Sequence, residues 1–137
     1  ADGRIRETDP SPTHEGLAPA TAATMTRMMT DVVCYGTGKQ AQLPGISVAG
    51  KTGTAYKTED GTYGEDGSRK YRASSVGFFP AHAPRVTILV TIDEPDPTSH
   101  DRFGGTAAAP LFTTVAAAAI HELLITPPCS DTGCPAG

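Results

Sequence analysis

The stretch that decides the fold reads ISVAGKTGTAY over residues 46–56. Ile46 and Val48 alternate with small residues, and this period of two is typical of a β-strand. Gly50 and Gly53 lie inside the same run. Because interior glycine weakens a strand, its presence indicates that another backbone segment approaches closely there. The stretch therefore predicts a strand over 46–56 with a second part of the chain packed against it.

Two further strands are expected downstream. A loop over 57–70, rich in Asp-Gly pairs and charges, is predicted to be exposed and mobile, and Tyr71–Phe79 returns from it as a strand. Val86–Ile92 reads VTILVTI, which is β-branched and apolar on both faces, so we expect a central or well-covered strand. The short links between the three strands favour antiparallel pairing.

Helical periodicity flanks the predicted sheet on both sides. Residues 18–33 carry apolar side chains at helical spacing, which predicts one buried face made of Met25, Met28, Met29, Val32 and Val33. Residues 106–125 carry a second apolar stripe made of Phe112, Val115, Ala116, Ala119, Ile120, Leu123 and Leu124. The expected fold class is α+β, with an antiparallel sheet of three strands flanked by N- and C-terminal helices.

Length and charge exclude several classes of function. The chain has 137 residues and a formal net charge of −4, which allows one domain and provides no long basic run for nucleic acid. Its longest apolar stretch, 107–125, is interrupted by His121 and Glu122 and is a poor membrane span. The four histidines lack metal-ligand spacing, so we expect no metal and no other cofactor. Asp93 and Glu94 are interpreted as turn residues rather than an acid/base pair.

Two motifs compete for Lys51. Residues 45–52, GISVAGKT, match the P-loop pattern G-x-x-x-x-G-K-[ST], which requires a strand before the loop and a helix after it. Leu43 and Pro44 do not form a buried strand, and no helical periodicity follows Thr52. The surrounding sequence therefore disfavours a nucleotide-binding site. Because the motif itself matches, nucleotide binding is retained as the less favoured alternative.

The second interpretation uses Lys51-Thr52-Gly53-Thr54 as an edge strand that binds an extended peptide. Gly53 removes a side chain that would obstruct the peptide. Lys51 supplies positive charge, and the hydroxyl groups of Thr52 and Thr54 can bind a terminal carboxylate. The backbone N–H of Thr54 can donate to a carbonyl oxygen under attack.

Five runs, in order and with matching spacing, carry a resemblance to a known family. They are GTG at 36–38, VAGKTGTA at 48–55, ASSVGFFPA at 73–81, IDEP at 92–95 and GGTAAAPLF at 104–112. Together they resemble the last part of the transpeptidase domain of class B penicillin-binding proteins, the membrane-anchored D,D-transpeptidases that cross-link peptidoglycan. The insert between the first two strands, and Thr52 in place of Ser, resemble the division-specific (septal) branch.

The resemblance implies the penicillin-binding protein/serine β-lactamase-like fold. Residues 1–128 would be the C-terminal portion of the transpeptidase domain, and 129–137 a Cys-containing tail. It also implies a serine acyl-enzyme formed on the D-Ala-D-Ala of a stem peptide, and covalent binding of β-lactams. Lys51 and Thr54 are the implied catalytic residues, and Thr52, Gly53 and Thr54 the implied substrate-binding residues.

Two of the three catalytic motifs of this family are absent. None of the lysines has Ser three positions before it, and the chain contains no Asn, so neither S-x-x-K nor S-x-N occurs. We therefore expect a C-terminal piece of a longer enzyme, inactive alone, that is completed by the upstream half of its own domain. A penicillin-sensing or non-catalytic binding domain of the same fold is the alternative within the family.

The resemblance also implies a location and partners. The parent would lie at the extracytoplasmic face of the bacterial plasma membrane, held by an N-terminal anchor that this chain does not contain, with divisome cell-wall synthesis proteins as partners. In that oxidising setting Cys129 and Cys134 are expected to form a small disulfide loop, and Cys34 to remain a buried free thiol. Without its upstream strands, the chain is expected to self-associate through an open edge at Val86–Ile92.

Overall fold

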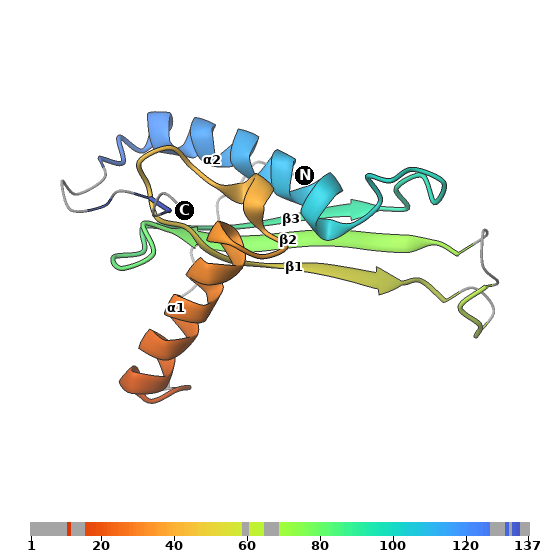
Figure 1. Ribbon diagram of the computed structural model, residues 1–137, viewed down its shortest axis with the longest axis horizontal. Helices are drawn as coiled ribbons and strands as arrows, with labels where there is room; N and C mark the ends of the chain where they lie inside the picture. Colours follow the sequence, from red (N-terminus) through yellow and green to blue (C-terminus); the bar gives the residue numbers. More distant parts are fainter. Residues whose placement is uncertain are drawn as a thin grey trace, which may run out of the picture.

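The computed structural model describes residues 11, 16–58, 61–64, 69–126, 131 and 133–134. Its elements follow the predicted order of helix, sheet and helix (Figure 1). They are α1 (Pro19–Cys34), the 3-10 helix η1 (Lys39–Ala41), β1 (Ala49–Tyr56), β2 (Tyr71–Phe79), β3 (Val86–Asp93), the π-helix η2 (Gly104–Ala108) and α2 (Ala109–Glu122). This is the expected α+β class, with a three-stranded antiparallel sheet between helices.

The sheet has the strand order β1-β2-β3, and both pairs are antiparallel. The register places Thr52 opposite Ser75, and Ser75 opposite Val90. Residues that face each other across strands share one face of the sheet, and the face alternates along each strand. Gly77 and Phe79, on the same face as Ser75, contact Phe112 of α2, which covers this face of the sheet (Figure 1). Thr52 and Thr54 therefore lie on the face covered by α2, whereas Lys51 lies on the opposite face.

The core lies between this sheet and α2. Phe79 and Phe112 are fully buried, and their ring centroids lie 6.3 Å apart in an edge-to-face arrangement. Gly77 makes room for this contact, because a Cβ at Gly77 would lie 3.0 Å from the Phe112 ring. The last turn of α1 adds Val33 to the same core. The side-chain amide of Gln42 then caps that turn by donating to the carbonyls of Val33 (3.0 Å) and Cys34 (3.2 Å).

The methionine face of α1 is not buried as predicted. Met25 is 45% exposed and Met28 57% exposed, whereas Val33 is 1% exposed. The reason is geometric, since α1 projects beyond the edge of β1 and only its C-terminal turn reaches the core (Figure 1). Periodicity identified an apolar face correctly, but within the described residues little covers it.

Two element boundaries and the environment of one strand differ from the predictions. Strand β1 begins at Ala49, because Ile46 pairs with Leu43 in a tight turn in which Gly45 has a φ of +71°. The predicted helix over 106–125 begins as the wider turn η2 and becomes α-helical at Ala109. Strand β3 is not central: in the described part of the chain it pairs with β2 alone, and Leu89 is 67% exposed.

Candidate active-site cleft

Three glycine-containing segments meet backbone to backbone at the open side of β1. A Cβ added to Gly104 would collide with the carbonyl oxygens of Gly53 and Ser74, and one added to Gly105 would collide with the carbonyl oxygen of Thr37. The start of η2 therefore lies against β1 and against the turn that follows α1. Another backbone segment, η2, approaches Gly53 as predicted, but the missing side chain that permits this contact is that of Gly104. A Cβ on Gly53 would instead meet the Ser74 hydroxyl oxygen at 2.8 Å.

Hydrogen bonds from the same segments orient the two threonine hydroxyls of the K-T-G-T run. The hydroxyl oxygens of Thr37 and Thr52 lie 2.7 Å apart, so one of them donates to the other. The backbone N–H of Gly104 donates to the hydroxyl oxygen of Thr54 at 3.1 Å. Both hydroxyls thus have a partner on a neighbouring segment and are held in place on the strand.

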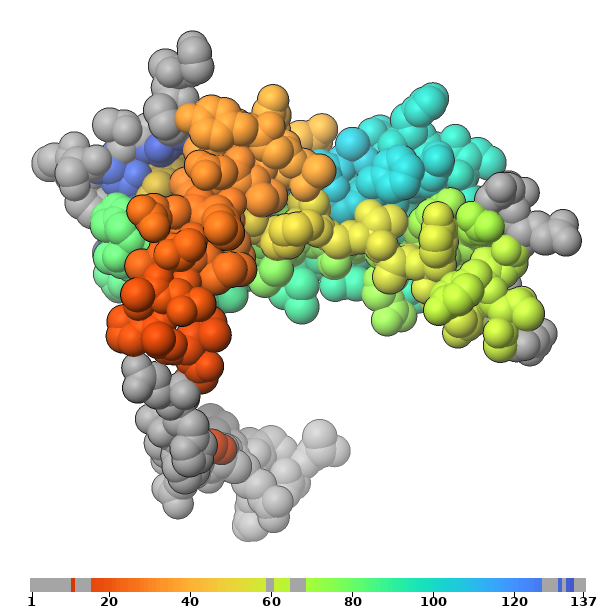
Figure 2. Space-filling view, turned by 60° about the horizontal axis from the view of Figure 1, so that its bottom comes forward, coloured from red at the N-terminus to blue at the C-terminus, as the bar shows by residue number. Residues whose placement is uncertain are grey.

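Both hydroxyls open into a pocket of about 450 Å³. It is lined by Thr37, Lys39, Gln40, Thr52, Thr54, Phe103, Gly105 and Thr106. In Figure 2 the yellow atoms of β1 run along the surface below the orange segment that follows α1 and the cyan segment before α2. An elongated ligand lying along β1 would therefore contact both flanking segments.

Lys51 does not line this pocket. It is exposed on the opposite face of β1, where its Nζ donates to the carbonyl oxygen of Thr52 at 2.7 Å. Strand alternation explains this placement, because neighbouring residues point to opposite sides of the sheet. Of the three residues predicted to line one cleft, Thr52 and Thr54 therefore line this pocket and Lys51 does not.

An aromatic cluster, which the sequence reasoning missed, extends the cleft towards the β1–β2 hairpin. The Tyr71 ring lies 5.3 Å from Tyr56 and 6.4 Å from Phe103, centroid to centroid. The Arg102 guanidinium stacks on Phe103 at 4.6 Å and on Tyr71 at 5.7 Å. Two features of the sequence could have indicated this cluster. The two tyrosines lie at the matching ends of adjacent predicted strands, and Phe103 directly precedes Gly104, which packs against β1.

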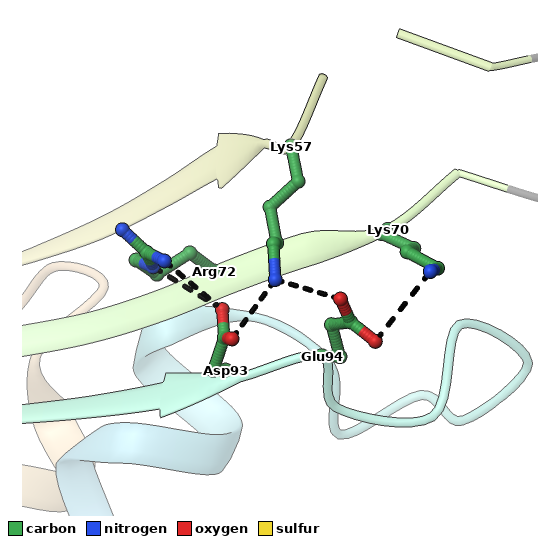
Figure 3. Close-up of polar contacts among 5 residues, drawn as sticks. All are labelled: Lys57, Lys70, Arg72, Asp93 and Glu94. Carbon is green, nitrogen blue, oxygen red and sulfur yellow. Dashed lines mark hydrogen bonds and ion pairs between the residues drawn. The ribbon is translucent and has the colours of Figure 1, made fainter. Parts of the chain in front are cut away.

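A cluster of ion pairs links Lys57, directly after β1, to the ends of β2 and β3 (Figure 3). Lys57 Nζ lies 2.8 Å from Asp93 and 2.6 Å from Glu94, and Arg72 adds a 3.2 Å contact to Asp93. Hydrogen bonds from Lys57 are the main cause that lowers the pKa of both carboxyl groups, and the same bonds raise the pKa of Lys57. Only Glu94 lies in the bend predicted for both residues, where it adopts a φ of +52°, because Asp93 is still the last residue of β3. The ion pairs with Lys57 and Arg72 were not predicted.

The tail is fixed to the body of the molecule through Asp131. This carboxylate accepts bonds from the backbone N–H of Ser47 at 2.9 Å and from its hydroxyl at 2.9 Å. Burial disfavours its charge, but the bonds from Ser47 and Gly133 outweigh that effect and lower its pKa. His82 lies nearby, but its 3.5 Å contact with Ser47 does not make a nucleophile–base pair, because the serine hydroxyl donates to Asp131 instead.

The disulfide differs from the predicted one. Cys134 is bonded to Cys34, with a Cα–Cα distance of 5.3 Å and a sequence separation of 100 residues. The predicted Cys129–Cys134 pair and the predicted free thiol at Cys34 are therefore wrong, while Cys129 itself lies outside the described residues. The physical reason is that Asp131, by binding Ser47, returns the tail to the C-terminal end of α1.

Other chemistries fit this arrangement poorly. Gly50, Lys51 and Thr52 lie within strand β1, where a P-loop would lead into a helix, so the P-loop interpretation is wrong in its structural context. No group of three His, Cys, Asp or Glu residues with metal-binding geometry occurs among the residues that the structure describes. In the same part of the chain, no helix is both long and apolar enough to cross a bilayer.

Comparison with known proteins agrees with this geometry. The profile of the family described as "Penicillin binding protein transpeptidase domain" matches residues 3–117. Stage V sporulation protein D of Bacillus subtilis is 33% identical over 123 residues, which is 90% of this chain and 18% of the relative. Peptidoglycan D,D-transpeptidase FtsI of Escherichia coli K12 is 33% identical over 132 residues, which is 94% of this chain and 21% of the relative.

A solved structure shows the same fold. The transpeptidase domain of penicillin-binding protein 3 from Burkholderia pseudomallei matches with a TM-score of 0.72 and 34% identity, over 90% of this chain and 36% of that one. The chain spans about a fifth of the length of the curated relatives named above. The family profile, the relatives and the fold agree, and the chain belongs to the penicillin-binding protein transpeptidase-domain family.

Proposed function

We propose that this chain forms the substrate-binding wall of a peptidoglycan D,D-transpeptidase that also binds β-lactams covalently. The observation that carries the proposal is the placement of the Thr52 and Thr54 hydroxyls in one pocket on an open strand edge. In the described residues β1 pairs with β2 alone, so its other edge is available to an extended peptide. A stem peptide ending in D-Ala-D-Ala has both the extended backbone and the terminal carboxylate that such a wall binds.

The reaction divides between this chain and the rest of the enzyme. A serine supplied by another segment of the protein attacks the carbonyl carbon of the penultimate D-Ala, and the terminal D-Ala leaves as the C–N bond breaks. An amine of a second stem peptide then displaces the serine and forms the cross-link. Here Thr52 and Thr54 hold the terminal carboxylate, the Thr54 N–H donates to the carbonyl oxygen, and Lys51 contributes positive charge from the other face of β1.

We further propose a septal role at the outer face of the plasma membrane, with divisome proteins as partners. FtsI and stage V sporulation protein D are among the relatives, and the Cys34–Cys134 disulfide is typical of proteins outside the cytoplasm. Peptidoglycan itself lies on that side of the membrane.

The test uses the full-length protein that contains this chain. Fluorescent penicillin should label it covalently, and hydrolysis or aminolysis of a D-Ala-D-Ala thioester should show turnover. Labelling without turnover would support the penicillin-sensing alternative. If neither labelling nor turnover occurs, the proposal fails.

A further inference from the structure

Thr37 lies outside the K-T-G-T run, yet its hydroxyl reaches into the same pocket. It belongs to the Gly36-Thr37-Gly38 turn, and its oxygen lies 2.7 Å from that of Thr52. Thr37 is exposed, but its position is fixed, because its carbonyl oxygen packs directly against Gly105. The hydroxyl of Thr37 is therefore held at a defined place beside β1.

The direction of these hydrogen bonds determines what the pocket offers a ligand. Two hydroxyls that share one hydrogen bond retain one O–H hydrogen between them, so the Thr37–Thr52 pair can donate one further bond. The Thr54 oxygen accepts from the Gly104 N–H, which leaves the Thr54 O–H hydrogen free to donate. The pocket thus presents two O–H donors whose oxygens are already engaged.

Two fixed donors match a carboxylate, which only accepts hydrogen bonds and has two oxygens. If Thr37 were removed, the Thr52 hydroxyl would lose its partner and rotate among its rotamers. A carboxylate that binds would then have to fix the Thr52 hydroxyl in one rotamer, and this loss of conformational entropy would weaken binding.

We infer that Thr37 is a positioning residue for the carboxylate of the donor peptide or β-lactam, acting through the Thr52 hydroxyl. The inference rests on the proposed function and extends it to a residue outside the three catalytic motifs. Because Thr37 is exposed and its side chain makes this one hydrogen bond in the described part of the chain, its hydroxyl contributes little to folding.

The experiment compares Thr37→Val and Thr37→Ser in the full-length protein. The rate of acylation is measured by mass spectrometry with benzylpenicillin and with its methyl ester, which lacks the carboxylate. Thr37→Val should lower the second-order rate with benzylpenicillin by roughly three- to ten-fold, the effect of one neutral hydrogen bond. The same variant should leave the much slower rate with the ester nearly unchanged, and Thr37→Ser should restore the rate with benzylpenicillin.

Two further variants separate positioning from a general structural effect. Thr114→Val removes an exposed hydroxyl that bonds within α2, at 3.2 Å from the Pro110 carbonyl, and should change neither rate. In a Thr52→Val background, Thr37→Val should have no additional effect, because its target is gone. Equal losses with both ligands, or additive losses with Thr52→Val, would overturn the inference. Failure of the unsubstituted protein to react would instead overturn the proposed function, and the inference with it.

Discussion

Lys51 is the residue whose role depends most on segments beyond this chain. It is exposed, lies across β1 from the threonine pocket, and its side chain donates a hydrogen bond to the Thr52 carbonyl. Lys51→Ala in the full-length protein should therefore leave the unfolding midpoint nearly unchanged. It should lower penicillin acylation by roughly ten- to a hundred-fold, as expected for a lost hydrogen bond from a charged group. Stopped-flow acylation with a fluorescent penicillin measures this, and a near-normal rate would remove Lys51 from the site.

The hydrogen bonds of the Asp131 carboxylate predict that attachment of the tail depends on pH. Its side chain is 3% exposed and its pKa is lowered in the folded state, so its contribution to stability is present above the unfolded carboxyl pKa. That contribution disappears as the pH falls through the lowered folded value. Asp131→Asn should cost about 1–3 kcal/mol of unfolding free energy at pH 7 and progressively less towards pH 3.

Urea denaturation of the purified chain at several pH values measures the Asp131 effect. Asp101→Asn is the matched control, since Asp101 is exposed and its side chain has no ion pair among the described contacts. A difference between wild type and Asp131→Asn that stays constant with pH would show that ionisation is not involved.

The sequence selected Lys51, Thr52 and Thr54 because the K-T-G-T run is local and resembles a family signature. The structure brings Thr52 and Thr54 together in one pocket, and their binding role stays a prediction. The partners Thr37 and Gly104 could not be identified, because they come from segments 15 and 50 residues away from the residues they bond. Packing of η2 against β1 brings Gly104 to Thr54, and packing of the end of α1 against β1 brings Thr37 to Thr52.

At the scale of elements, β3 forms one outer edge of the described sheet. Its side chains alternate between half-buried and exposed, and in the described residues its outer edge has no strand partner. Such an edge with apolar side chains can pair with a second chain. We expect the isolated 137-residue chain to self-associate through β3.

Leu89→Lys should weaken this association, since an edge lysine opposes pairing. Sedimentation velocity at increasing concentration would show a larger monomer fraction for the variant. Leu111→Lys, on exposed α2 surface, controls for charge and for loss of an apolar side chain. A monomeric wild-type chain at high concentration would contradict the prediction.

The sequence located the helices and strands along the chain more accurately than it predicted which of their side chains are buried. Period-two patterning and hairpin links located Tyr71–Phe79 at the observed bounds of β2, and helical spacing located α1 to within a residue at either end. Burial failed for the face of Met25 and Met28, because periodicity identifies an apolar face but not the element that covers it. The same limit applies to β3, whose composition resembles that of a central strand.

At the scale of the whole molecule, the Cys34–Cys134 disulfide joins the end of α1 to the tail. It spans 100 residues of sequence, so reduction restores a large loop entropy to the unfolded chain. Replacing both cysteines by serine should lower the free energy of unfolding by about 2–5 kcal/mol. Cys129→Ser should leave both the disulfide and the stability unchanged.

Chemical denaturation, combined with peptide mapping of the unreduced protein, tests this pairing. A peptide that links Cys34 to Cys134 is the expected result, whereas a Cys129–Cys134 link would contradict it. The sequence could not select the pair, because three cysteines allow three pairings and proximity along the chain favours the wrong one.

The same disulfide makes most of this chain a covalent ring, which encloses the whole sheet, η2 and α2. A protease that cuts once in the exposed hairpin at 61–64 would therefore open the ring without releasing either piece. The nicked protein should migrate as one band on a non-reducing gel and as two bands after reduction. Because β1 and β2 would remain tethered at their far ends, the threonine pocket is expected to survive a cut that would divide an uncrosslinked chain into two.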